Sequence, residues 1–306
     1  MYRRDFIRTA VVATPAAFAL PNLLLASKTQ VALPPGGFPD LVAVRNGEPA
    51  PMFDRAMANF GGMKRFVAKG QTVVVKPNIG WPREPRTGAN TNPELVKRVV
   101  EHCVEAGAKK VYVLDHSVGP RNAVCYEKSG IGAAAKDGGA VATPGGDEKY
   151  YQTVEIAGAA RLKTTKVHEL VLGCDVLVNV PVLKHHMGAR ATIAMKNLMG
   201  VVWDRVAYHK LGLQECISDF CLFKKPQLNV VDAYRVTMAN GPQRARPEDV
   251  LAKKMLLVST DIVSADAAAV RILGATPEDA KHIVLGHQKQ IGNMDLSSLK
   301  IDRIAL

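Results

Sequence analysis

Short apolar runs alternate with amphipathic stretches along most of the chain. The run at 72–78 (TVVVKPN) is rich in β-branched residues and ends near a proline, which predicts a buried strand that runs into a loop. A helix start follows at 90–94 (NTNPE), with an Asn or Thr cap, proline in the first turn and an acid behind it. Apolar residues then recur at helical spacing over 95–104, and Gly107 ends the helix. A strand at 109–115 completes a β-α-β unit, which predicts parallel strands joined by a right-handed crossover.

The same alternation continues through the rest of the chain. Further strands are expected at 175–182, 227–232, 255–259 and 301–306, with an edge strand at 41–45, and further helices at 163–172, 211–223, 264–273 and 277–285. The glycine-rich segment 119–151 is expected to be mostly loop with one short helix. The pattern predicts an α/β fold, with a mainly parallel sheet and helices on both faces, in a single large domain over residues 40–306.

Polar side chains gather directly after the predicted strands. Ligands of open parallel sheets bind outside the carboxyl ends of the strands, so these positions are candidates for a site. The residues concerned are Lys76, Asn78, Asp115, His116, Ser117, Lys184, His185, His186, Asp232, Thr260 and Asp261.

The segments around Lys184-His185-His186 and Lys196-Asn197 are the densest candidates. Lysines with histidines are suited to an anionic substrate, with one imidazole as general acid, general base or metal ligand. We therefore take His186, His185 and Lys184 as the catalytic candidates. Adjacent residues on a strand face opposite ways, so both histidines face the site only if the chain has left the sheet there. The alternative interpretation is a solvated basic loop.

Arg205 belongs to a second candidate segment, which also holds Trp203, Asp204 and His209. A guanidinium is suited to grip a carboxylate or phosphate, and the alternative is a surface ion pair beside a packed tryptophan. The expected ligand-binding residues are thus Lys76, Asn78, Lys196, Asn197 and Arg205. Asp115, Asp232 and Asp261 are candidate carboxylate ligands for a divalent metal.

The N-terminal segment predicts export. Residues 1–28 carry the adjacent arginines Arg3 and Arg4, then Phe6 and Arg8, an uncharged stretch and small residues, which is typical of a twin-arginine (Tat) signal peptide. The expected location is periplasmic or otherwise extracytoplasmic, with the protein exported folded by the Tat machinery. An uncleaved membrane anchor is the alternative.

Composition and charge narrow the expected partners. The chain has 306 residues and a formal charge of +12, of which +9 remains without residues 1–28. This surplus favours an anionic ligand, an acidic partner or a membrane surface. Nucleic acid is not indicated, because the expected compartment argues against it and no nucleic-acid motif is present.

The cysteines do not form an obvious ligand set. There are five, an odd number, and none is arranged as C-x-x-C. Cys216 and Cys221 lie on a predicted helix with side chains about 140° apart, so one metal could not readily bind both. A complete set of iron–sulfur ligands is not visible.

A succession of short motifs resembles a known family. The motifs are Val75-Lys76-Pro77-Asn78, Thr91-Asn92-Pro93-Glu94, Ala106-Gly107-Ala108, Asn179-Val180-Pro181 with Lys184 and His186, Lys196-Asn197 with Gly200, residues 229–232, and Asp261 with Asp266. In this order they resemble the domain of unknown function family DUF362, in its Tat-exported branch, over residues 73–301. The resemblance implies one α/β domain whose biochemical role is unsettled. Some members are described as iron–sulfur proteins, but this chain lacks their C-x-x-C-x-x-C run.

The sequence thus predicts an exported DUF362-like protein that binds a small anionic ligand or a metal at the strand ends, and it leaves open whether the protein is an enzyme. One alternative is an iron–sulfur or other redox accessory protein of an electron-transfer chain, which would use Cys216 and Cys221 and a redox partner. Another is a binding protein without catalytic activity.

Overall fold

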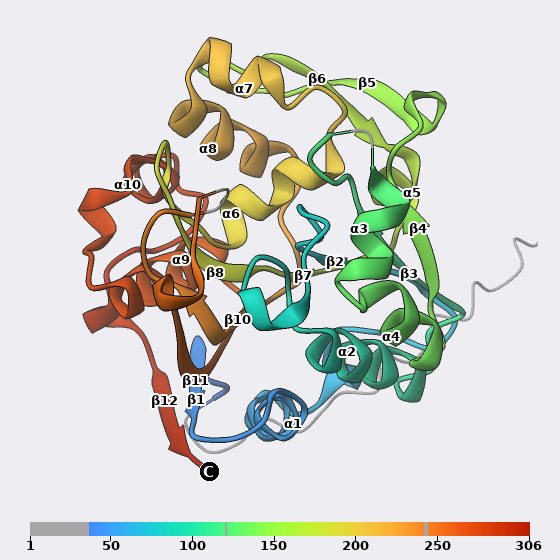
Figure 1. Cartoon of the computed structure of the whole chain (residues 1–306), viewed down its shortest axis with the longest axis vertical. Helices are drawn as coiled ribbons and strands as arrows, with labels where there is room; N and C mark the ends of the chain where they lie inside the picture. The colour runs from blue at the N-terminus through green and yellow to red at the C-terminus, as the bar shows by residue number, and fades with distance from the viewer. Residues whose placement is uncertain (1–36, 120, 242–243) are drawn as a thin grey trace, which may run out of the picture.

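A mainly parallel sheet organises the described part of the chain (Figure 1). The computed structural model describes residues 37–119, 121–241 and 244–306. The expected signal peptide, residues 1–28, lies outside the described residues. The strands are β1 (Leu41–Arg45), β2 (Thr72–Pro77), β3 (Lys110–Asp115), β4 (Val141–Pro144), β5 (Tyr151–Glu155), β6 (Thr164–His168), β7 (Val176–Val180), β8 (Val182–His186), β9 (Arg190–Thr192), β10 (Leu228–Thr237), β11 (Val250–Ser259) and β12 (Ile301–Ala305).

Helices fill most of the connections between these strands. The α-helices are α1 (Pro49–Asn59), α2 (Pro93–Glu105), α3 (Asn122–Lys128), α4 (Ile131–Asp137), α5 (Glu169–Gly173), α6 (Ala194–Asn197), α7 (Val206–Leu211), α8 (Leu213–Phe223), α9 (Ile262–Val270) and α10 (Lys281–Gln288). The short 3-10 helices are η1 (Met63–Arg65), η2 (Pro85–Thr87), η3 (Glu148–Tyr150), η4 (Leu198–Val201), η5 (Pro247–Asp249), η6 (Arg271–Leu273), η7 (Pro277–Asp279) and η8 (Leu296–Ser298).

The strand order creates an opening at one edge of the sheet. Among the described residues, ten strands join in the order β12-β1-β11-β10-β7-β2-β3-β4, with β8 paired to β10 and β9. Strands β4, β3, β2, β7 and β10 are parallel neighbours, and β11 runs antiparallel to β10 and β1. Strand β7 lies between β2 and β10, but after Pro181 its continuation β8 pairs only with β10 and β9. The chain therefore separates from β2 at the carboxyl end of the sheet.

Alternating side chains of the central strands supply two cores, one on each face of the sheet. Val73 and Val75 of β2 pack in a core with α1, α2, α3 and α4, whereas Val74 packs in a core with α6, α8, α9 and α10. This is the period of two expected of strands buried on both faces. The predicted α/β fold, with a mainly parallel sheet and helices on both faces, is confirmed.

The structure corrects several predicted elements. The stretch 163–172 is not one helix, because its first half is β6, which pairs with β5 in a separate two-stranded ribbon. Strand β1 is not at the edge, since β12 pairs with its outer side. Residues 119–151 hold much more structure than one short helix, namely α3, α4, β4 and η3. The partner of β1 is distant in the sequence, whereas β6 pairs with the strand that directly precedes it.

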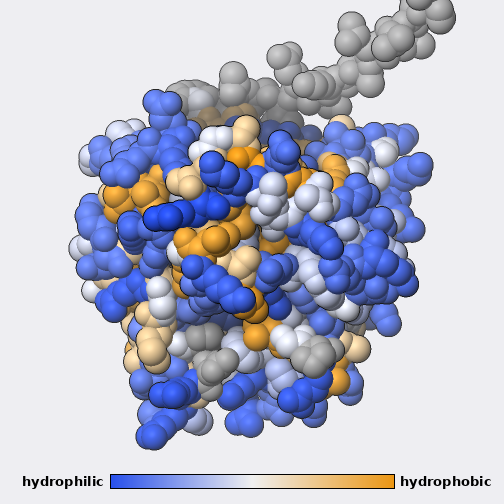
Figure 2. Space-filling model, turned by 90° about the horizontal axis from the view of Figure 1, so that it is seen from above, coloured by the Kyte–Doolittle hydropathy of each residue, from blue (hydrophilic) through white to orange (hydrophobic). Residues whose placement is uncertain are grey.

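None of the helices in the described ranges is long and apolar enough to cross a membrane. Figure 2 looks down on the end of the molecule that carries α7 and the β5–β6 ribbon. Hydrophilic residues cover most of that face, and a patch of hydrophobic residues lies near its middle.

Candidate functional site

A cavity of about 500 Å³ lies where the chain separates from β2, at the carboxyl ends of β2, β3 and β8. Its lining includes most of the polar residues predicted from the sequence to form a site. Those residues are Lys76, Asn78, Asp115, Lys184, His186, Lys196, Asn197, Arg205 and His209. They come from five separate parts of the chain, and the fold brings them to one cavity. Asp115 is the only carboxylate among the described residues that line it.

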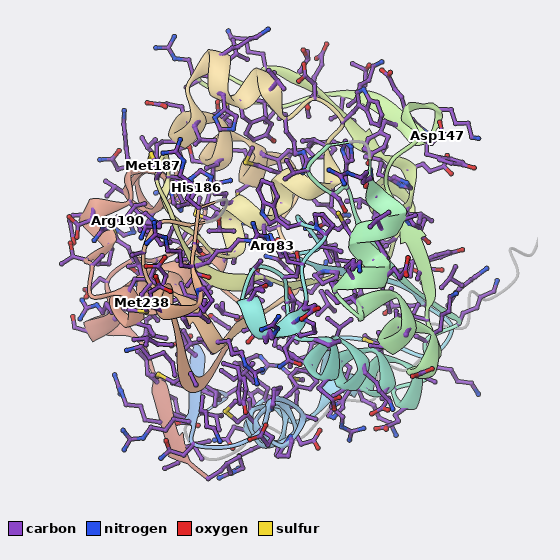
Figure 3. All side chains as sticks on the ribbon, viewed as in Figure 1. Arg83, Asp147, His186, Met187, Arg190 and Met238 are labelled. Carbon is purple, nitrogen blue, oxygen red and sulfur yellow. The ribbon has the colours of Figure 1, made fainter. Side chains whose placement is uncertain are left out.

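Strand β8 explains why one of the two neighbouring histidines reaches the cavity. Lys184, His185 and His186 lie within β8, whereas the sequence predicted them to follow a strand. Successive side chains on a strand point to opposite sides, so Lys184 and His186 share the cavity side. His185 does not line the cavity. Figure 3 shows His186 and the neighbouring Met187 where β8 turns toward β9.

A buried ion pair forms the floor of the cavity. Lys76 Nζ lies 2.7 Å from Asp115 Oδ1, and both side chains are almost fully buried, with exposed fractions of 1% and 2%. Lys76 also donates to the carbonyl of Pro77 and to Asn197 Oδ1. A Cβ atom at Gly200 would lie 1.8 Å from Asp115 Oδ1. Glycine at this position therefore leaves room for the ion pair.

Asparagine side chains link the cavity to the centre of the sheet. Lys184 Nζ donates to Asn78 Oδ1 at 2.8 Å, and Asn78 Nδ2 donates to Asn197 Oδ1 at 2.9 Å. Asn197 Nδ2 in turn donates to Asn179 Oδ1 at 2.8 Å. Asn179 Nδ2 then donates to Asn229 Oδ1 at 3.1 Å. Each amide in this network has a defined orientation, because each one accepts from one neighbour and donates to the next.

Asp266 positions the helix that supplies Lys196 and Asn197. Its carboxylate accepts hydrogen bonds from the first backbone amides of α6, at 2.6 Å from Ala194 N and 3.1 Å from Met195 N. The side chain is fully buried. Asp266 lies on α9, and its carboxylate holds the neighbouring helix α6 in place.

The cations lining the cavity differ in their hydrogen-bond partners. Lys184 Nζ donates to Ala89 O as well as to Asn78. Both guanidinium ends of Arg205 donate to backbone carbonyls, at 2.7 Å to His116 and also to Ser117. Lys196 Nζ, by contrast, contacts Met199 Sδ at 3.5 Å, a weak acceptor. Among the described residues, Lys196 Nζ has no oxygen acceptor within hydrogen-bond distance.

Burial and mutual repulsion make the lysines unusually easy to deprotonate. Burial, followed by the charge of Lys196, lowers the pKa of Lys184 to about 7. Burial, followed by the charge of Arg205, lowers the pKa of Lys196 to about 8. For Lys76 burial lowers the pKa, and the neighbouring Asp115 opposes this effect. Besides being buried, these amines thus lie close to other cations, and the described lining of the cavity has one carboxylate, Asp115, to balance them.

His186 is held as a neutral hydrogen-bond donor. Its Nδ1 accepts from the backbone amides of Gly188 and Ala189, both at 3.1 Å, so the hydrogen of the neutral ring is on Nε2. Burial, then the charges of Lys196 and Lys184, lower its pKa to about 3. An imidazole with this pKa stays neutral through the physiological range.

The carboxylates predicted to bind a metal do not come together. Asp232 Oδ2 accepts from Asn92 N at the start of α2, and its Oδ1 accepts from Tyr234 N. Asp261 caps α9 through the amides of Val263 and Ser264. Neither lines the cavity with Asp115. Over the ranges that the structure describes, no group of three or more His, Cys, Asp or Glu residues could hold a metal ion.

The cysteines are buried and unpaired in the described structure. Cys216 and Cys221 lie on α8, and Cys221 Sγ donates to the carbonyl of Ile217. Burial raises the pKa of Cys216 to about 11, so its thiol stays protonated. No ligand set for an iron–sulfur cluster is present among the described residues.

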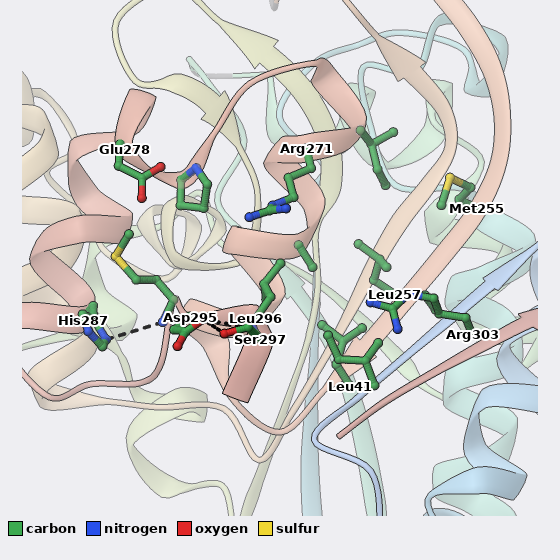
Figure 4. Close-up of a pocket in the computed structure, with 16 residues that line it drawn as sticks. Leu41, Met255, Leu257, Arg271, Glu278, His287, Asp295, Leu296, Ser297 and Arg303 are labelled. Atoms are coloured by element: carbon green, nitrogen blue, oxygen red, sulfur yellow. Dashed lines mark hydrogen bonds between the residues drawn. The ribbon is translucent and has the colours of Figure 1, made fainter. Parts of the chain in front are cut away.

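Two further hollows differ from this cavity in chemistry. One of about 400 Å³ shares Lys184 and is lined by Arg83, Arg86, Arg235 and Arg246, which adds to the local positive charge. The other, of about 840 Å³, lies between strands β12, β1 and β11 and helix α9 (Figure 4). Its polar groups include both acids and bases, and Asp295 there caps η8 through Ser297 N.

Several lining residues were not anticipated from the sequence. Thr192 enters through β9, where it pairs with Lys184 across a hairpin. Trp81, Met187 and Met199 contribute apolar surface. A short turn at 187–189 separates two stretches able to form strands. This pattern indicates a hairpin, which would have placed Thr192 beside Lys184.

Comparisons with known proteins agree with the motifs. The profile of the family described as Domain of unknown function (DUF362) matches residues 73–271. The match ends at residue 271, whereas the resemblance read from the motifs was expected to extend to residue 301. A thylakoid-associated protein from Synechocystis sp. is 27% identical over 228 residues, which cover 71% of this chain and 67% of that protein.

Two solved structures are similar over part of their length. One is a crystal structure of a protein from Thermotoga maritima, with a TM-score of 0.47, 11% identity, and coverage of 74% of this chain and 60% of that chain. The other is the lactate racemase apoprotein from Thermoanaerobacterium thermosaccharolyticum, with a TM-score of 0.36, 15% identity, and coverage of 75% and 48%. The chain thus spans less than two thirds of either solved protein.

Proposed function

The chain belongs to the DUF362 family of unknown function, and from that premise we propose that it binds a small anionic ligand in the cavity at the carboxyl ends of β2, β3 and β8. The observation that carries the proposal is an imbalance of charge. Lys76, Lys184, Lys196 and Arg205 line the cavity, and Asp115 is the one carboxylate among its described lining residues. Asp115 is already paired with Lys76. A bound anion would balance the remaining charges.

The groups around the cavity suit a carboxylate or phosphate. His186 supplies a neutral Nε2–H donor, and Lys196 supplies an amine without an oxygen partner among the described residues. Donors aimed at an anion in a site shielded from water bind more strongly than the same donors in bulk solvent. Apolar contacts from Trp81 and Met187 would cover the part of the ligand that lies away from the charges.

A metal is the weaker candidate occupant. The described residues lack a group of three metal-ligating side chains, and the predicted carboxylates Asp232 and Asp261 are engaged elsewhere. The positive charge of the cavity also opposes a cation. The residues present therefore fit an anion and do not fit a metal.

Titration of the protein with oxalate and with inorganic phosphate, followed by calorimetry, tests the proposal. We expect saturable binding at one site, weakened by added salt because the attraction is electrostatic. Replacing His186 by Ala should weaken binding at least fivefold, since it removes one donor. The matched control is His185→Ala, on the same strand but outside the cavity, which should bind normally. Equal effects of the two variants, or no binding by the unaltered protein, would contradict the proposal.

We also propose that the protein functions outside the cytoplasm. The support is the twin-arginine pattern of residues 1–28, with Arg3 and Arg4 ahead of an uncharged stretch. The Tat route carries folded proteins, and a cavity assembled from five parts of the chain would then form before export.

A further inference from the structure

Lys196 is the lysine of the cavity with the fewest hydrogen-bond partners. Lys76 Nζ has three oxygen partners, at 2.7 Å to Asp115, 2.6 Å to Pro77 and 3.1 Å to Asn197. Lys184 Nζ has two, Asn78 Oδ1 and Ala89 O. The only hydrogen-bond acceptor of Lys196 Nζ within the described structure is the thioether sulfur of Met199. An amine held by strong acceptors is a poor nucleophile, so the lysine suited to react is Lys196.

The surroundings of Lys196 make its neutral form more accessible than that of an ordinary lysine. The side chain is partly buried, and it lies on a short helix whose start is fixed by the carboxylate of Asp266. Burial lowers the pKa of Lys196 to about 8, and the nearby cations Arg205 and Lys76 add to this effect. A desolvated lysine next to other cations is one of the recognised ways to obtain a nucleophilic amine near neutral pH.

We infer that Lys196 forms a Schiff base with the ketone of a 2-oxo acid bound in this cavity. The inference rests on the proposed function, because the carboxylate of such an acid is the anion that the cavity would bind. A 2-oxo acid carries its ketone directly beside the carboxylate. A carboxylate attracted by Lys184 and the Nε2–H of His186 therefore places the ketone carbon close to the remaining amine.

The reaction needs no oxidant, metal or additional reactant. The lone pair of the neutral amine of Lys196 attacks the ketone carbon, and the carbonyl π electrons move to oxygen. A proton moves from nitrogen to that oxygen, which gives a carbinolamine. Loss of the hydroxyl with the second amine hydrogen releases one water and leaves the C=N bond. The ketone oxygen thus leaves as water, and no atom is oxidised or reduced.

Reductive trapping tests this inference. The full-length protein is treated with pyruvate, the simplest 2-oxo acid with a ketone, and sodium borohydride, which reduces an imine to a stable secondary amine. Mass spectrometry should then show one adduct of reduced pyruvate on the peptide that contains Lys196. Formation of the adduct should increase with pH above about 8, because the amine reacts without its proton and the bound carboxylate raises its pKa from about 8 in the free protein. Excess oxalate should suppress it by competing for the cavity.

Matched variants make the assignment specific. Lys196→Met and Lys196→Arg should both lose the adduct, and the arginine variant keeps the positive charge of the site. Lys210→Met changes an exposed lysine on the nearby α7 and should keep the adduct. Circular dichroism confirms that each variant is folded. An adduct spread over many lysines, or placed on Lys184, would overturn the inference.

The outcomes also separate this inference from the proposed function. If pyruvate and oxalate bind by calorimetry but borohydride traps no adduct, the cavity binds anions and the Schiff base is wrong. If neither compound binds, the proposed function fails together with the inference. An adduct on Lys196 that oxalate suppresses supports both.

Discussion

Anion binding in the cavity should be accompanied by proton uptake. Without a bound anion, the pKa is about 7 for Lys184 and about 8 for Lys196, both below the ordinary value of 10.5. A dianion such as oxalate placed beside these amines favours their charged forms and raises both pKa values. The complex therefore binds more protons than the free protein. Oxalate itself stays fully ionised above neutral pH, so the protein must supply the change.

The magnitude follows from the two pKa values. At pH 7.5, an amine with a pKa of about 7 is about one-quarter protonated, and one with a pKa of about 8 is about three-quarters protonated. The two amines of the free protein thus carry about one of two possible protons, and full protonation in the complex requires an uptake of about one. Affinity should be highest below about pH 7 and should fall as the pH rises through 7 to 8, by about tenfold per pH unit for each proton taken up.

Calorimetry in buffers of different ionisation enthalpy measures this uptake directly. The apparent binding enthalpy should vary linearly with the buffer enthalpy, with a slope of about one proton at pH 7.5. In Lys196→Met the uptake should be clearly smaller, because one titrating amine is absent and the other regains a higher pKa. A slope of zero, or proton release, would refute the reasoning, since it would mean that the anion does not meet these amines.

Two further predictions concern stability and location. Gly200→Ala should lower the free energy of unfolding by on the order of 3 kcal/mol in urea, because its Cβ would lie 1.8 Å from Asp115 Oδ1 and disrupt a buried ion pair. In the control Gly173→Ala, the added Cβ has nothing within 4 Å, so equal stability of the two variants would count against the packing argument. A reporter fused behind residues 1–36 should leave the cytoplasm through the Tat system. Replacing Arg3 and Arg4 by lysines should keep the reporter in the cytoplasm. Export that persists after this exchange would exclude the twin-arginine route.

Much of the site follows from one rule applied to the sequence. Parallel strands place their carboxyl ends at one edge, so residues after the predicted strands could be expected to meet there. Lys76 and Lys184 do line the same cavity. The rule could not separate His185 from His186, because that distinction depends on whether the chain is still a strand at that point.

The carboxylates show where sequence reasoning reaches its limit. A buried carboxylate is equally suited to bind a ligand or to accept hydrogen bonds from backbone amides. Asp232 accepts a hydrogen bond from Asn92, 140 positions away, and Asp266 holds α6, 72 positions away. These amides are brought near only by the complete fold. The stretch 163–172 begins as a strand for a more local reason, because the preceding strand β5 pairs with it.

The asparagine network has an electrical consequence for the cavity. Hydrogen bonds run in one direction from Lys184 through Asn78, Asn197 and Asn179 to Asn229, whose Nδ2 lies 3.5 Å from the carbonyl of Ser259. Every amide oxygen in this row accepts from the side of the cations, so the row acts as an aligned set of dipoles with its negative ends facing them. The cations are partly stabilised without additional carboxylates, which would repel an incoming anion. A substitution at Asn229, at the far end of this row, should therefore alter the affinity of the cavity for its ligand.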